Sequence, residues 1–272
     1  MDPKVSFITG VKNRSEELKE MIESLLKQDM PEWEAIIVDD HSDEPIKELV
    51  ESFHDPRLNY FRLPENMTGI SNARNFAVSK ARAEILLTAD GDDINEPDRA
   101  RVIYDLMAKN NYDVFYSNMY DYFPAKNKKI KRKFQPFNAA LFKMFNFMTN
   151  PGTAFRKSKF LEVEGFDPGF VVSEDYDLWL RILNAGAKFG YTEKILVNYR
   201  YSANSLSRAS LSRIHDYVMK TRIKNKIPPF DIGEIKKYAL PEIAEQVLSK
   251  RGREVWQDDR FVNVSRTETA GR

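Results

Sequence analysis

The chain has 272 residues, of which 42% are hydrophobic and 31% are charged, a composition typical of a folded and water-soluble protein. Its 42 Lys and Arg residues nearly balance its 41 Asp and Glu residues, so no overall charge favours nucleic acid or a membrane as partner. Cys is absent, which excludes disulfide bonds, zinc–thiolate sites and cysteine nucleophiles.

The N-terminal residues lack the basic and apolar segments of a secretion signal. No window approaches the roughly 20 apolar residues of a membrane-spanning helix. We therefore expect a cytoplasmic protein, either free or working at the inner face of the membrane.

The first half of the chain alternates short apolar runs with segments of helical periodicity. The runs predict strands near 5–9, 35–38, 58–63 and 85–88. Apolar residues spaced by three or four predict helices over 18–26, 46–53, 71–82 and 97–107, the last opened by Pro97. Four strand–helix units in succession predict an α/β fold with a doubly wound, mostly parallel sheet.

The second half is less regular. We expect strands near 114–119, 153–155, 188–191 and 195–199, and helices near 158–164 and 176–185. A basic stretch and the aromatic-rich segment 134–147 show no regular pattern. From about 210 the pattern predicts helices with a break at Pro228–Pro229, followed by a mobile polar tail at 253–272.

Acidic residues follow two of the predicted strands directly. Asp39 and Asp40 come after the second strand, and Asp90, Asp92 and Asp93 come after the fourth. Ligands of open parallel sheets bind outside the carboxyl ends of the strands. Clustered carboxylates repel one another, and a divalent cation with oxygen ligands would compensate. The alternative is a solvated acidic turn that caps the next helix.

Five motifs occur in order along the chain: Val5–Ile8, Val38–Ser42, Gly69–Asn75, the Asp90–Asp93 cluster and Ser173–Trp179. Together they resemble glycosyltransferase family 2, and the resemblance covers about residues 4–202. It implies the GT-A fold, a Rossmann-like, mostly parallel sheet flanked by helices. We expect a domain over 1–205, with its nucleotide-binding half at about 1–110 and its acceptor half at about 111–205, and a helical extension and tail over 206–272.

The resemblance also implies a nucleotide site in the first half. Asp40 would read the base, usually uracil, and Asp90 would bind the ribose and share with Asp92 a bound Mn²⁺ or Mg²⁺. The other expected nucleotide-binding residues are Gly10, Lys12, Asn13, Asp39, Arg74 and Asn75. Helix or turn capping by Asp39 and Asp40 and a surface salt bridge of Arg74 stay open as alternatives, and Asp93 could cap the following helix.

The resemblance assigns the general base to Asp175, with Glu174 beside it as a supporting or acceptor-orienting group. A position near a helix N-terminus favours the anion, so we expect Asp175 to be ionised at neutral pH. Trp179 and Arg200 are implied near the acceptor or the diphosphate. The alternatives are helix capping for the two acids and a structural role for Arg200.

Three positions depart from the family pattern. Gly10 and Val11 replace the usual Pro-Thr, Lys12 stands where an aromatic residue commonly contacts the base, and Ser202 replaces a histidine. These changes put the identity of the base and the complete set of metal ligands in question.

The basic run 126–133 contains six cationic residues. It is either a solvated loop or a contact for an anionic acceptor or a membrane surface. The three histidines are scattered, and the glycines form neither a dinucleotide-binding nor a P-loop motif.

We therefore expect a metal-dependent inverting glycosyltransferase that transfers a sugar from a nucleotide diphosphate sugar, with UDP as the expected nucleotide, to an acceptor hydroxyl. The acceptor would be a glycan or a lipid-linked molecule of polysaccharide, glycolipid or cell-surface glycan synthesis, with no nucleic-acid partner. The alternatives are a nucleotidyltransferase, which would release pyrophosphate, and an inactive GT-A protein that binds sugar or nucleotide.

Overall fold

The computed structural model describes residues 2–44, 46–201 and 211–227, with short stretches at 235–237, 239–241, 244–245 and residue 249. The described chain forms two compact units, Met1–Phe137 with Met148–Arg208, and Asn138–Phe147 with Ala209–Arg272. The predicted break at Pro228–Pro229, the polar tail and Ser202 lie outside the described residues.

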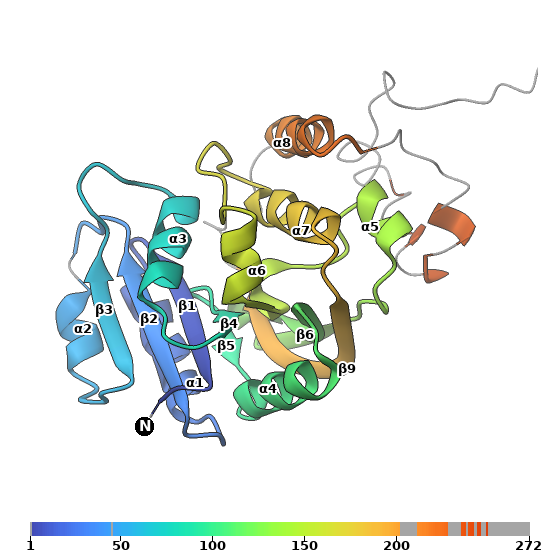
Figure 1. Ribbon diagram of the computed structural model, residues 1–272. Helices are drawn as coiled ribbons and strands as arrows, with labels where there is room; N and C mark the ends of the chain where they lie inside the picture. The colour runs from blue at the N-terminus through green and yellow to red at the C-terminus, as the bar shows by residue number, and fades with distance from the viewer. Residues whose placement is uncertain are drawn as a thin grey trace, which may run out of the picture. The chain divides into compact units, whose positions relative to one another are not determined.

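The first unit is built on one mixed sheet (Figure 1). Its strands are β1 (Val5–Val11), β2 (Trp33–Asp39), β3 (Leu58–Arg62), β4 (Ile85–Thr88), β5 (Ile94–Asn95), β6 (Val114–Phe123), β7 (Lys128–Arg132), β8 (Thr153–Arg156) and β9 (Phe189–Arg200). Their order is β3-β2-β1-β4-β8-β6-β9-β5, with β7 paired to β6. Strands β3, β2, β1 and β4 are parallel, whereas β8 runs antiparallel to both of its neighbours. The α/β class is therefore confirmed.

Helices connect and cover the strands. They are α1 (Ser15–Leu26), α2 (Lys47–Glu51), α3 (Ile70–Lys80), α4 (Arg99–Asn110), α6 (Lys157–Glu162) and α7 (Glu174–Asn184), with 3-10 turns η1 (Pro124–Lys126) and η2 (Asn150–Gly152). The second unit contains α5 (Ala139–Met144) and α8 (Leu211–Lys224). In the described part of the chain, no helix has the length and apolar character needed to cross a membrane.

Strands β1, β2 and β4 are buried on both faces, which explains their continuous apolar runs, whereas β3 is half-buried. Alternate residues such as Phe7 and Ile37 join the apolar faces of α1 and α4 in one core cluster. On the opposite face α3 packs closely on β1. A Cβ at Gly10 would lie 2.9 Å from Ile70 and 3.0 Å from Ala73, so a glycine lets the helix approach the strand.

Several predicted boundaries differ from the observed ones. Helix α4 begins at Arg99 and not at Pro97. The basic stretch, expected to be irregular, contains β7, which forms a hairpin with β6. The strands expected at 188–191 and 195–199 are one strand, β9. The aromatic segment Asn138–Phe147, expected in the acceptor half, groups with the C-terminal unit.

Candidate active site

The carboxyl ends of β1, β2 and β4 meet at one edge of the sheet. The backbone N–H of Asp40 donates to Val11 at 2.8 Å, and that of Ala89 donates to Ile8 at 3.0 Å. The acidic residues that follow β2 and β4 are thereby gathered on both sides of the end of β1. This is the edge at which the sequence predicts ligand binding.

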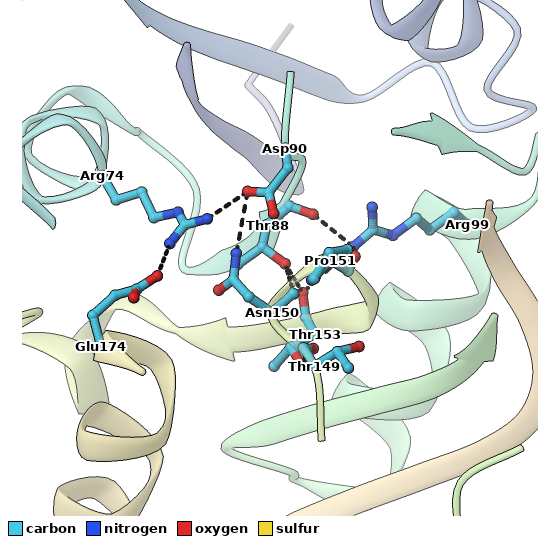
Figure 2. A network of polar contacts seen from close by, with 9 residues as sticks. All are labelled: Arg74, Thr88, Asp90, Arg99, Thr149, Asn150, Pro151, Thr153 and Glu174. Atoms are coloured by element: carbon cyan, nitrogen blue, oxygen red, sulfur yellow. Dashed lines mark hydrogen bonds and ion pairs between the residues drawn. The ribbon is translucent and has the colours of Figure 1, made fainter. Parts of the chain in front are cut away.

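Arg74 of α3 connects the acidic loop after β4 to the start of α7 (Figure 2). Its guanidinium donates at 2.6 Å to Asp90 and at 2.6 Å to Glu174, which is 100 residues away in sequence. The Arg74 side chain is 6% exposed. Burial lowers its pKa, but the charges of Asp90 and Glu174 outweigh burial and raise the pKa above its ordinary value. Arg74 therefore stays charged and is a buried link, not a surface salt bridge.

Asp175 lies in the first turn of α7, next to Glu174. Its carboxylate accepts the backbone N–H of Tyr176 at 2.7 Å. Burial, reinforced by the charge of Glu174, raises the pKa of Asp175 to about 7. The expectation of full ionisation at neutral pH is therefore wrong, because burial and the charge of Glu174 favour the neutral acid. A carboxyl with this pKa can accept a proton near neutral pH.

Both oxygens of Asp40 are engaged by the loop that leads into α3. Thr68 donates its hydroxyl at 3.0 Å, and the backbone N–H of Gly69 donates at 2.9 Å. Asp40 is 7% exposed. Its carboxylate therefore fixes the loop before α3, next to the end of β1 where a nucleotide base is expected.

Asp39 has a different environment from Asp40. It is fully buried and accepts the backbone N–H of Ser42 at 2.9 Å. Its other oxygen accepts from Tyr60 and Arg62, both at 3.2 Å. These contacts give Asp39 the turn-capping role that the sequence left open as an alternative.

Asp92 and Asp93 point to different surroundings. Asp92 lies 3.0 Å from the guanidinium of Arg14. Burial raises the pKa of Asp92, Arg14 opposes that shift and Asp90 adds to it. Asp93 is buried and accepts the backbone N–H of Arg200 at 2.8 Å, so it holds β9 against the acidic loop. Asp93 is therefore bound to the backbone of Arg200, whereas Asp92 forms an ion pair with Arg14.

Arg200, at the end of β9, is buried against the acidic loop. Its Nε donates to the backbone oxygen of Asp92 at 2.7 Å, and its guanidinium also bonds Glu20. Arg200 thus fixes the backbone that carries Asp92.

The loop after β1 is the most exposed part of the predicted nucleotide site. Lys12 and Asn13 are both exposed. Asn13 exchanges hydrogen bonds with Asp43, at 2.9 Å from its amide and at 2.8 Å to its carbonyl oxygen. The loops after β1 and β2 are therefore joined, and Lys12 is presented to solvent between Val11 and this link.

Two predicted site residues are committed to packing. Asn75 brackets the backbone of Phe166, with distances of 2.8 and 2.9 Å. Trp179 is fully buried, with its ring centroid 5.4 Å from that of Phe155. Any effect of these side chains on binding would act through the position of α3 or α7.

The structure adds three residues that the sequence did not single out. Arg14 forms an ion pair with Asp92 at 3.0 Å, and Asn150 donates a hydrogen bond to Asp90 at 3.2 Å. Arg99 is fully buried and donates to the backbone oxygens of Thr88 and Pro151 at 2.8 and 2.7 Å. Asn150 precedes a Pro-Gly pair, a turn signal that marks a bend but not a ligand.

The sequence is similar to those of known glycosyltransferases. The profile of glycosyl transferase family 2 matches residues 6–164. An uncharacterized glycosyltransferase of Methanocaldococcus jannaschii is 31% identical over 236 residues, covering 82% of this chain and 81% of the relative. The UDP-Gal:alpha-D-GlcNAc-diphosphoundecaprenol beta-1,3-galactosyltransferase of Escherichia coli is 28% identical over 214 residues, covering 76% and 77%.

Solved structures show the same fold. S. aureus TarS 1–349 in complex with UDP-GlcNAc superposes with a TM-score of 0.68 at 20% identity, covering 92% of this chain and 72% of TarS 1–349. In a longer TarS chain the match covers 44% of that chain. The sheet, the order of the motifs and these relatives agree, and the chain therefore belongs to glycosyltransferase family 2 as a glycosyltransferase with the GT-A fold.

Proposed function

We propose that the protein transfers a sugar from a UDP-sugar to an acceptor hydroxyl with inversion at the anomeric carbon. The observation that carries this proposal is the Arg74 link between Asp90, at the nucleotide edge, and Glu174, next to Asp175. One end of this link, Asp90, lies at the nucleotide edge, and the other end, Glu174, is the sequence neighbour of Asp175, whose pKa is raised. A donor whose diphosphate lies at the acidic loop would present its anomeric carbon toward Asp175.

The proposed reaction is one displacement. The acceptor oxygen attacks the anomeric carbon while its proton passes to the Asp175 carboxylate. The bond from the anomeric carbon to the diphosphate oxygen breaks, and its electron pair leaves with the nucleoside diphosphate. Attack opposite the leaving group inverts the configuration.

A divalent cation fits the residues of the acidic loop. Burial and the charge of Asp90 both raise the pKa of Asp92, and a bound cation would relieve this cost. The hydrogen bonds from Arg74 and Asn150 both reach the same oxygen of Asp90. Within the described ranges no group of three His, Cys, Asp or Glu could hold a metal alone. Mg²⁺ and Mn²⁺ sites often use one or two carboxylates plus substrate phosphates and water. The bound cation would stabilise charge on the departing diphosphate.

The donor assignment is tested by a thermal-shift panel of UDP, GDP and CDP with Mn²⁺ or Mg²⁺. UDP at about 100 times its Kd should stabilise the protein by roughly 2.7 kcal/mol, a shift of roughly 5–11 °C at roughly 2–4 °C per kcal/mol. Excess chelator should remove most of the shift and abolish transfer. A larger shift with GDP or CDP would overturn the uridine assignment, and full activity in chelator would overturn the metal.

The raised pKa of Asp175 predicts a pH dependence. Since the base must be unprotonated, kcat/KM should rise as pH increases through about 7 and level off above it. The raised pKa has the opposite effect on stability: the folded protein holds the Asp175 proton more tightly than the unfolded chain does, so the free energy of unfolding falls as pH rises from about 4 to about 7. Rates measured from pH 5 to 9 check this, and a flat profile would contradict the base role.

A lipid-linked acceptor is proposed from two observations. Two of the E. coli relatives are named for diphosphoundecaprenol acceptors. In the β6–β7 hairpin, Arg132 pairs with Asp121 at 2.6 Å. Among the described residues the other cations of the hairpin form no ion pair and are exposed: Lys126, Lys128, Lys129, Lys131 and Lys133. This basic hairpin suits an anionic membrane surface.

Vesicle sedimentation tests the membrane contact. Changing Lys126, Lys129 and Lys131 to Ala should weaken binding to phosphatidylglycerol vesicles by roughly 100-fold, because each cation near the surface contributes to binding. A matched variant with Lys19, Lys27 and Lys109 changed to Ala, also exposed, should bind as the unaltered protein does. Equal binding by the two variants would contradict the membrane contact and would mean that these lysines only keep an edge strand solvated.

A further inference from the structure

Asn150 presents a buried acceptor that no described group satisfies. The residue is 5% exposed and lies in η2, directly before β8. Its amide nitrogen donates to Asp90 at 3.2 Å, and its carboxamide oxygen has no hydrogen-bond partner. Buried carbonyl oxygens nearly always have a donor, so this one calls for an explanation.

The orientation of the Asn150 amide is fixed by its neighbour. Asp90 forms an ion pair with Arg74, and a carboxylate in an ion pair accepts hydrogen bonds and donates none. The amide nitrogen must therefore face Asp90, and the oxygen must face away from it. Reversing the amide would set two acceptors against each other and would leave the nitrogen without an acceptor.

The backbone that carries Asn150 is held rigidly (Figure 2). Its carbonyl oxygen accepts the hydroxyl of Thr88, the last residue of β4. Arg99 bonds the carbonyl oxygens of Thr88 and of Pro151, so it ties the turn to the strand that carries the acidic loop. The free oxygen is therefore held in place before any ligand arrives, which is what a binding group requires.

The position of Asn150 indicates the ligand atom. It touches Asp90, which Arg74 joins to Glu174 and thus to the start of α7. In the proposed reaction, which this inference presupposes, the transferred sugar lies between the nucleotide edge and Asp175. The sugar is the part of the donor that brings several hydroxyl donors to this place. We propose that Asn150 is a specificity-determining residue whose carboxamide oxygen accepts a hydrogen bond from a hydroxyl of the donor sugar.

Calorimetry with UDP and with UDP-sugars tests the assignment. UDP-glucose, UDP-galactose and UDP-N-acetylglucosamine are compared first, and monodeoxy analogues of the best of them follow. Asn150→Ala should raise the Kd of that UDP-sugar roughly 3- to 10-fold, the size of one neutral hydrogen bond, while the Kd of UDP stays unchanged. One monodeoxy analogue should bind the unaltered protein more weakly, and that difference should vanish in the variant.

The remaining outcomes separate the possible failures. An equal loss for UDP and UDP-sugar would mean that Asn150 acts on the ribose or through Asp90, and it would overturn the proposal. A monodeoxy series with the same pattern in both proteins would do so as well. Asn150→Leu, which fills the same space without a polar group, repeats the test if the Ala variant does not fold. If the unaltered protein binds none of these UDP-sugars, the proposed function itself fails.

Discussion

Replacing Asp175 by Asn is expected to lower kcat by roughly 10²–10⁴ while the Kd of UDP changes by less than about twofold. The amide keeps the shape of the side chain and the contact with Tyr176 but cannot accept the proton of the acceptor. The loss should appear in kcat because the proton moves only in the transition state. Steady-state rates and calorimetry on the same preparation measure the two quantities.

Asp98→Asn is the matched control for this variant. Asp98 also lies at a helix start, before α4, and its carboxylate contacts Lys194 at 3.2 Å on the surface. Its replacement should leave kcat unchanged. Near-normal turnover of Asp175→Asn, or a product with retained configuration, would show that Asp175 is not the base.

Replacing Arg74 by Met is expected to destabilise the protein by roughly 3–5 kcal/mol. The change leaves the carboxylates of Asp90 and Glu174 without their shared partner, and breaking a buried ion pair from one side carries this cost. Urea unfolding at neutral pH measures the change in the free energy of unfolding.

Arg101→Met is the control for the Arg74 experiment. Arg101 pairs with Asp29 at 2.7 Å, but both side chains are exposed to solvent, so removing this pair should barely change the urea midpoint. An Arg74 variant as stable as the Arg101 variant would mean that the link does not hold the site together.

The parallel half of the fold could be predicted from local periodicity. Strands β1, β2 and β4 are buried on both faces and their sequences are apolar runs, and helix α1 shows regular apolar spacing. Strand β7 could not be found this way, because an edge strand of lysines has no apolar face. Strand β9 was divided in two because Glu193 and Lys194 are exposed where its register with β6 shifts.

The candidate site shows the same limit at the level of single residues. The order of the motifs placed Asp40, Asp90 and Asp175 at helix and strand ends, which local sequence defines. The contact of Arg74 with Glu174 joins residues 100 positions apart and leaves no local signal. The raised pKa of Asp175 likewise depends on burial by distant segments. Asn150 is recognisable only once Asp90 lies beside it.

The central claim, inverting transfer from a UDP-sugar to a hydroxyl, is tested most directly by ³¹P and ¹H NMR of one reaction. The protein is incubated with Mn²⁺, a UDP-sugar that it binds and a lipid-linked GlcNAc-diphosphate acceptor analogue. The account predicts that UDP and a glycoside of inverted configuration appear in equal amounts, and that both are lost in Asp175→Asn. Release of pyrophosphate, a product of retained configuration, or binding of the donor without any turnover would contradict it.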